Sequence, residues 1–113
     1  MSAALRLTEQ YFAYSNKSNL AQVAQLLSES SSYYSVNLGF FVGKKDIMAM
    51  QTAFHSQYQT VQWTIEQLAE IKPNVVEIEF SFDGRLQDGT ESKRQGREHI
   101  LIYGSLIQHI TVS

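Results

Sequence analysis

Apolar residues recur at helical spacing through the first half of the chain. The spacing predicts a helix over residues 3–15 and a second over 20–27, separated by a polar break at 16–19. A third predicted helix follows Gly43 and carries its apolar face as far as Tyr58. The first half of the chain is therefore expected to be mainly helical.

The spacing changes to two residues after about residue 60. Apolar and polar side chains alternate over 61–66 and, most regularly, over 76–82. A polar loop is predicted over 83–89. The stretches 95–103 and 106–112 read as the two strands of a last hairpin. The second half of the chain is therefore predicted to form antiparallel strands.

The serine run 28–32 interrupts the helical pattern. It reads as a turn that leads into a short strand over 33–36. With no repeat or linker in the sequence, we expect one domain over residues 1–113. Its predicted class is α+β, a mostly antiparallel sheet packed by three N-terminal helices.

Composition narrows the classes of function. Hydrophobic residues make up 43% of the chain and charged residues 18%, with a formal net charge of −2. A nucleic-acid-binding surface would need a basic stripe, so no nucleic-acid partner is expected. The absence of cysteine excludes disulfides and thiolate metal sites. Without an apolar leader or a membrane-length apolar run, the expected location is cytoplasmic, with no membrane partner.

The order and spacing of these segments resemble the nuclear transport factor 2-like superfamily, which includes SnoaL-like domains and ketosteroid isomerases. The resemblance covers nearly the whole chain and rests on the aromatic end of the first helix, Asn19-Leu20, Gly43 with Ile47, the strand 77–83 and the stretch 98–102. It implies a curved, cystatin-like sheet that forms a cone with the helices around an apolar pocket. It also implies a homodimer that uses the outer face of the sheet.

Ketosteroid isomerases give the sharpest comparison. In them, a helix-one tyrosine and a protonated strand acid form an oxyanion hole. The resemblance places these two roles on Tyr11 and Glu98, and the position of the proton-moving base on Ser35. A serine hydroxyl does not take up a proton at neutral pH without its own base. The resemblance therefore implies a donor pair without the isomerase's base.

Strand parity sets the direction of the residues around Glu98. If Glu98 points inward, Ile100 and Ile102 do so too. Leu101 and Tyr103 then lie on the outer face, at or near the expected dimer contact.

Each predicted pocket residue is chosen on one of two grounds. Either the spacing of apolar residues places it on the inner face of a helix or strand, or the resemblance gives its position a function. The predicted pocket residues are Tyr11, Tyr33, Ser35, Phe54, Trp63, Ile78, Phe80, Phe82, Glu98 and Ile100. Each has an alternative interpretation. The aromatic residues can simply fill the core, Tyr11 can place its hydroxyl near water, and Glu98 can be a solvated strand residue. The three histidines lack metal-ligand spacing and read as surface or interface residues, and no cofactor is expected.

Three functions remain open from the sequence. The leading hypothesis is a domain that binds a small apolar molecule with one polar oxygen. The alternative is an isomerase-, dehydratase- or cyclase-type enzyme in which Tyr11 and Glu98 stabilise developing charge. The third is a non-catalytic association module that works through its dimer face.

Overall fold

The computed structural model describes residues 2–113 and contains three helices and one six-stranded sheet. In chain order the elements are α1 (Ala3–Asn16), α2 (Leu20–Gln25), β1 (Leu27–Ser35), β2 (Gly39–Val42), α3 (Lys44–Ser56), β3 (Tyr58–Lys72), β4 (Val75–Leu86), β5 (Glu91–Tyr103) and β6 (Leu106–Val112). The predicted α+β class is confirmed. The three helices lie in the first half of the chain, and strands β3 to β6 make up the second half.

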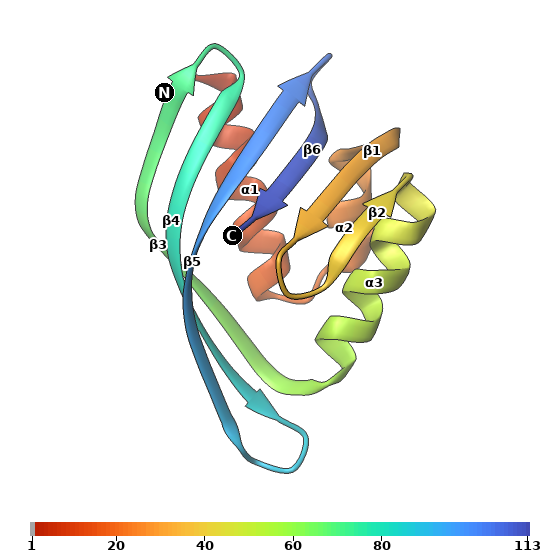
Figure 1. Ribbon diagram of the computed structural model, residues 1–113, viewed down its shortest axis with the longest axis vertical. Helices are drawn as coiled ribbons and strands as arrows, with labels where there is room; N and C mark the ends of the chain where they lie inside the picture. Colours follow the sequence, from red (N-terminus) through yellow and green to blue (C-terminus); the bar gives the residue numbers. More distant parts are fainter. Residues whose placement is uncertain (1) are drawn as a thin grey trace.

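The sheet has the order β2-β1-β6-β5-β4-β3. Neighbouring strands are antiparallel except β1 and β6, which run parallel. The sheet curves strongly, and the helices lie on its concave side (Figure 1). Helix α1 packs on β3 and β4, while α3 packs on β1 and β2. A space enclosed by two helices and a bent sheet is therefore built into the topology.

The prediction of a turn over residues 28–32 is wrong. These residues belong to β1, which begins at Leu27, and β2 was missed altogether. A serine run usually marks a turn because its hydroxyls bond locally to the backbone. Here they also bond across the sheet to β6: Ser31 Oγ donates to the carbonyl of Ile107 at 2.6 Å, and Ser28 Oγ donates to the Gln108 side chain at 2.9 Å. The long-range partner makes the strand possible.

The polar loop is also shorter than predicted, because Asp83 and Gly84 continue β4. Gly84 has a steric reason to lie in a strand. A Cβ atom there would lie only 2.6 Å from Cε1 of Tyr58 and 2.8 Å from Cζ of Phe82. The glycine makes room for two aromatic rings, so it marks a close approach within the sheet and not its end.

The parity predicted for β5 is confirmed. Glu98, Ile100 and Ile102 are buried, whereas Leu101 and Tyr103 are 45% and 77% exposed. The inward residues of β4 are buried as well, in the alternation that the sequence predicts over 76–82. No helix among residues 2–113 is long and apolar enough to cross a membrane.

Candidate functional site

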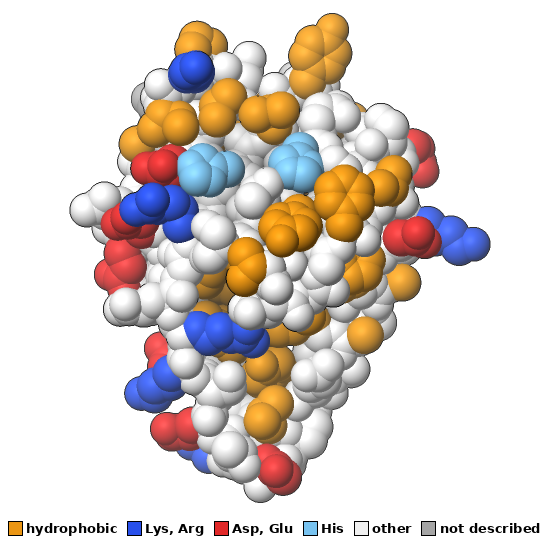
Figure 2. Space-filling view, in the orientation of Figure 1, with side chains coloured by type: hydrophobic (Ala, Val, Ile, Leu, Met, Phe, Trp, Pro, Cys, Tyr) orange, Lys and Arg blue, Asp and Glu red, His pale blue; other side chains and the backbone are white. Residues whose placement is uncertain are grey.

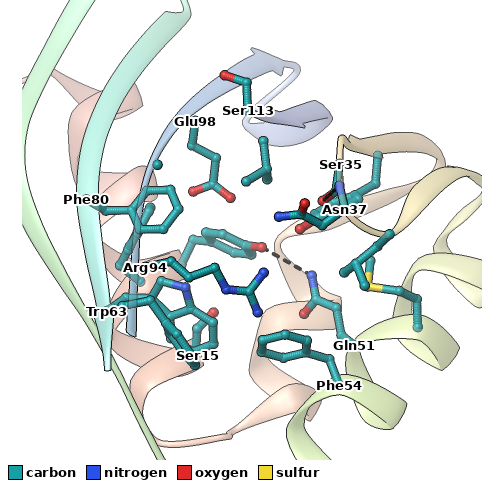
Figure 3. A pocket seen from close by; sticks show the side chains of 18 of the residues that line it. Ser15, Ser35, Asn37, Gln51, Phe54, Trp63, Phe80, Arg94, Glu98 and Ser113 are labelled. Atoms are coloured by element: carbon teal, nitrogen blue, oxygen red, sulfur yellow. Dashed lines mark hydrogen bonds between the residues drawn. The ribbon is translucent and has the colours of Figure 1, made fainter. Parts of the chain in front are cut away.

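A cavity lies between the concave face of the sheet and helices α1 and α3 (Figure 3). About 100 Å³ of it is open to the centre of a water molecule, several times the roughly 10–15 Å³ that one buried water needs. The cavity is lined by Tyr11, Phe12, Ser15, Tyr33, Ser35, Asn37, Leu38, Met50, Gln51, Phe54, His55, Trp63, Phe80, Phe82, Arg94, Gln95, Gly96, Glu98, Val112 and Ser113. Seven of these twenty residues are phenylalanine, tyrosine or tryptophan and nine have polar or charged side chains, so the cavity combines aromatic surface with many polar groups.

The aromatic wall is a cluster of mutually packed rings from α3, β3 and β4. The ring centroids of Trp63 and Phe82 are 4.8 Å apart, and those of Phe54 and Phe82 are 5.8 Å apart. These distances and the tilted ring planes are those of favourable aromatic pairs. The cluster therefore gives the cavity a preformed apolar surface.

Trp63 is fixed in this wall by the last residue of α1. The side chain of Asn16 accepts a hydrogen bond from Trp63 N at 2.6 Å and donates one to Trp63 O at 2.9 Å. One amide thus satisfies both backbone groups of one strand residue. The end of α1 is locked onto β3, which holds the indole beside the cavity.

Gly96 allows another ring into the wall. A Cβ atom at this position would lie 2.7 Å from Cζ of Phe80 and 3.1 Å from the carbonyl oxygen of Ser113. Gly96 and Phe80 are directly paired across β5 and β4. The missing side chain on one strand makes room for the ring from the next.

Tyr11 and Gln51 meet inside the cavity. Gln51 Nε2 donates a hydrogen bond to the Tyr11 hydroxyl oxygen at 3.1 Å, and both residues are buried. Burial, followed by the nearby Glu98, raises the pKa of Tyr11 well above its usual range, so the phenol keeps its proton. That proton is free to donate, because the hydroxyl oxygen acts as the acceptor towards Gln51. Gln51 Oε1 is buried with no hydrogen-bond partner in the described chain.

Glu98 projects into the cavity from β5 (Figure 3). It is 6% exposed, and within residues 2–113 no hydrogen bond to its carboxyl group is present. Burial raises the pKa of Glu98 to about 8. The carboxyl group is therefore mostly neutral at pH 7 and carries a proton that it can donate.

Tyr33 and Ser35 approach the cavity from β1. Both are buried, and the Ser35 hydroxyl accepts a hydrogen bond from Asn37 N at 3.2 Å. Burial and then the charge of Glu98 raise the pKa of Tyr33, while Arg94 acts on it in the opposite direction. Tyr33 is therefore a neutral phenol at physiological pH, close to Glu98 and Arg94.

Arg94 enters from β5 on the same face as Glu98. Its guanidinium carbon lies 6.0 Å from the centroid of the Phe54 ring and 5.8 Å from that of Phe82, within the range of cation–π contacts. Among the described lining residues it is the only lysine or arginine. Arg94 therefore places a positive charge over the aromatic wall.

Most of the residues predicted for the pocket lie together around this cavity. The exceptions are Ile78 and Ile100, which do not line it although they are completely buried. They share the inward parity of Phe80 and Glu98, but Ile78 precedes Phe80 by two residues and Ile100 follows Glu98 by two, in the part of the sheet where the core is closed. Their prediction as pocket walls is therefore corrected to core packing.

Several lining residues escaped the sequence analysis as candidates. Gln51 lies on the apolar face of the helix predicted after Gly43, where a lone amide among apolar residues is the available signal. Arg94 is two positions from Gly96 and four from Glu98, so strand parity alone places it on the same face. His55, expected on the surface, is half-buried at the cavity edge, with its ring 5.5 Å from Trp63. Asn37 and Ser113 carry no local signal for the site.

No protein-family model matches the sequence, and no curated protein is significantly similar to it. Solved structures do match. A nuclear transport factor 2-like protein from Burkholderia pseudomallei superposes with a TM-score of 0.87 at 9% identity, covering 100% of this chain and 91% of its own. A protein with a ketosteroid isomerase-like fold from Catenulispora acidiphila, in complex with trimethylamine, gives 0.85 at 16% identity, with 95% and 83% covered. A SnoaL-like protein from Shewanella putrefaciens gives 0.85 at 9% identity, with 99% and 89% covered.

These similarities extend over almost the whole chain, and at such low identities they concern the fold. They agree with the element order and the curved sheet described above. The resemblance found in the sequence is thereby confirmed: the chain has the nuclear transport factor 2-like fold, which it shares with ketosteroid isomerase-like and SnoaL-like proteins.

Proposed function

We propose that the cavity binds a small, mainly apolar molecule that presents one polar oxygen to Tyr11 and Glu98. The observation that carries this proposal is a group of unpaired polar atoms in an aromatic cavity. The Glu98 carboxyl group has no hydrogen bond within the described chain, and buried Gln51 Oε1 has no partner there either. An unpaired buried polar group costs roughly 1–3 kcal/mol, so a ligand that supplies the partners gains affinity.

The polar atoms define what the ligand oxygen has to be. The Tyr11 hydroxyl and the neutral Glu98 carboxyl each offer a proton, which suits a carbonyl or hydroxyl oxygen. A hydroxyl group on the ligand would in addition donate to Gln51 Oε1. The rings of Phe54, Trp63 and Phe82 suit an apolar body. The complex of the Catenulispora acidiphila protein with trimethylamine supports the idea that this fold accommodates a small molecule.

A direct test uses the single tryptophan of the chain as a reporter. Trp63 lines the cavity, so titration with the neutral ketone 2-acetylnaphthalene is expected to change its fluorescence in a saturable way. Tyr11→Phe removes one donor and should weaken binding roughly five- to tenfold, since a net hydrogen bond is worth about 1 kcal/mol. The control Glu79→Gln, on the other face of the sheet, should leave binding unchanged. Native mass spectrometry of protein from its own host would identify a retained ligand.

A second candidate is an isomerase-, dehydratase- or cyclase-type enzyme that uses Tyr11 and Glu98 as an oxyanion-hole-like pair. The favourable observation is the pKa of Glu98 at about 8, close to the working pH of a group that transfers protons. Ser35 occupies the position at which the resemblance places a base, but within the described residues no imidazole or carboxylate is hydrogen-bonded to it. Glu98→Gln separates the candidates: a donor role preserves binding, whereas a base role loses turnover.

We further propose that the chain forms a homodimer through the convex face of the sheet. Figure 2 views this face and shows apolar side chains gathered over β1 and β2 and at the tip of β5. Tyr34, Phe40, Leu101 and Tyr103 are 41%, 61%, 45% and 77% exposed. Exposed apolar side chains gathered on one face favour burial against a partner. Sedimentation velocity at micromolar concentration is expected to show a dimer, and a monomer would contradict the proposal and the association-module alternative.

The expected cytoplasmic location stays a prediction.

A further inference from the structure

Among the described lysine and arginine side chains of β4 and β5, only Arg94 has no acidic partner. Arg85 lies 3.4 Å from Glu91, and Arg97 lies 2.6 Å from Glu79. Arg94 forms no ion pair or hydrogen bond within residues 2–113, and only the Phe54 and Phe82 rings hold its guanidinium group. A guanidinium group offers five N–H donors in a planar fork that matches a carboxylate. The donors of Arg94 are therefore free for a ligand.

We infer that the molecule bound in this cavity carries an acidic group, which the guanidinium group of Arg94 holds at one end while the other end reaches Tyr11 and Glu98. This inference rests on the proposed function and specifies its ligand class: an apolar acid, with a carboxylate at one end and a neutral oxygen at the other.

The spacing of the charged residues supports two separate ends. Arg94 and Glu98 lie on the same face of β5, four residues apart. At about 3.3 Å per residue, their Cα atoms are roughly 13 Å apart along the strand. Gly96 lies between them and leaves the Phe80 ring as the surface of that stretch. Along β5 the face thus carries a cation, a glycine against the Phe80 ring and a buried acid in sequence, which matches a molecule with an acidic head and an apolar body.

The charge balance of the lining supports an anion. Arg94 and Glu98 are its only lysine, arginine, aspartate or glutamate side chains among the described residues. With the pKa of Glu98 at about 8 and that of His55 lowered by burial, neither adds a full charge at pH 7. The side chains of the lining then carry a net charge close to +1, although the side chains of the whole chain have a formal net charge of −2. Arg94 is exposed and lies over two aromatic rings of the lining, where its planar guanidinium group can bind a carboxylate through charge-assisted, bidentate hydrogen bonds.

The test compares two ligands of nearly the same shape, one with a carboxylate and one with a neutral amide at the same position. Binding of 6-acetyl-2-naphthoate and of its neutral amide, 6-acetyl-2-naphthamide, is measured by calorimetry at pH 6.5 and low salt. The wild-type protein is expected to bind the acid at least tenfold more tightly than the amide. Arg94→Gln should weaken binding of the acid about tenfold and change binding of the amide less than twofold. The matched control Arg97→Gln, three residues away on the opposite face, should leave both affinities within twofold. Raising the salt to 0.5 M should reduce the preference for the acid.

The possible failures point to different claims. Equal affinities for acid and amide in the wild-type protein would overturn the inference. An equal loss of both ligands in Arg94→Gln would overturn it too, because the arginine would then act only through packing. If 2-acetylnaphthalene binds but neither 6-acetyl-2-naphthoate nor 6-acetyl-2-naphthamide does, the inference is wrong and the proposed function stands. If none of the three binds, the proposed function falls together with the inference.

Discussion

The ionisable side chains on the two faces of β5 differ in whether they have a partner. On the convex face, Lys93 pairs with Asp83, Arg97 with Glu79 and His99 with Glu77, all across to β4. On the concave face, Arg94 and Glu98 point into the cavity, and neither has a hydrogen bond or ion pair within the described chain. Cross-strand charge pairs are an ordinary means of stabilising a sheet. The Arg94 guanidinium group and the Glu98 carboxyl group on the other face form no such pair, so their contribution has to be sought in binding.

The largest expected effect concerns the buried acid. The pKa of Glu98 is about 8 in the folded chain against an ordinary value of 4.5. The folded state thus binds more protons than the unfolded state between these values, and stability is lost as the pH rises through this window. The free energy of unfolding of Glu98→Gln minus that of the wild-type protein should therefore increase by about 3 kcal/mol from pH 5 to pH 8, because only the wild-type protein loses stability over this range.

Urea denaturation at a series of pH values measures this difference. Glu79→Gln, which alters a partly exposed acid on the convex face, should follow the wild-type protein within about 0.5 kcal/mol over the same range. If the two variants had the same pH dependence, the contrast between the faces would be wrong.

The next effect is steric. Gly96→Ala should destabilise the protein by about 1–3 kcal/mol, because the new Cβ atom overlaps the Phe80 ring and approaches the Ser113 carbonyl. The neighbouring change Gln95→Ala affects an exposed side chain and should stay within about 0.5 kcal/mol. Thermal or chemical denaturation compares them. Equal effects would show that the cavity face is not tightly packed at this position.

The smallest expected effect is on the stability of variants that lose buried polar groups, with a hydrogen-bond partner or without one. The double change Tyr11→Phe with Gln51→Leu removes a hydrogen bond together with the partnerless Gln51 Oε1. Stability should stay the same or rise by up to about 1 kcal/mol, while affinity for 2-acetylnaphthalene falls.

Thr8→Val is the matched control, since buried Thr8 Oγ1 donates to the Ala4 carbonyl at 2.9 Å. Its loss should cost about 1 kcal/mol and leave binding intact. A large loss of stability in the double variant, as for a fully paired buried polar network, would mean that these groups support the fold.

The fold was largely predictable because its strongest patterns are local. The alternation over 76–82 and the parity around Glu98 follow from the period of two that every strand has. The serine run was misread because its decisive partners, Ile107 and Gln108, lie about eighty residues away. No local rule contains that information.

The candidate site was predictable only in part. Parity predicts which residues face inward, but Arg94 lies one residue before the predicted strand over 95–103, whereas β5 begins at Glu91 in the structure. Parity does not predict where along a strand the cavity ends, which depends on how the helices pack. Ile78 and Ile100 were therefore included with Phe80 and Glu98, although the structure places them in the closed core.

The parallel pairing of β1 with β6 has a consequence for folding. Strands β3, β4, β5 and β6 pair as hairpins between strands that follow one another along the chain. By contrast, β1 pairs with the last strand, β6, so that Leu27 lies opposite Ile107. Closing so long a loop carries a large entropic cost before any contact compensates for it. We therefore expect this junction to form late. Since β1 brings Tyr33 and Ser35 to the cavity, a chain still emerging from the ribosome has no complete cavity until β6 is free to pair.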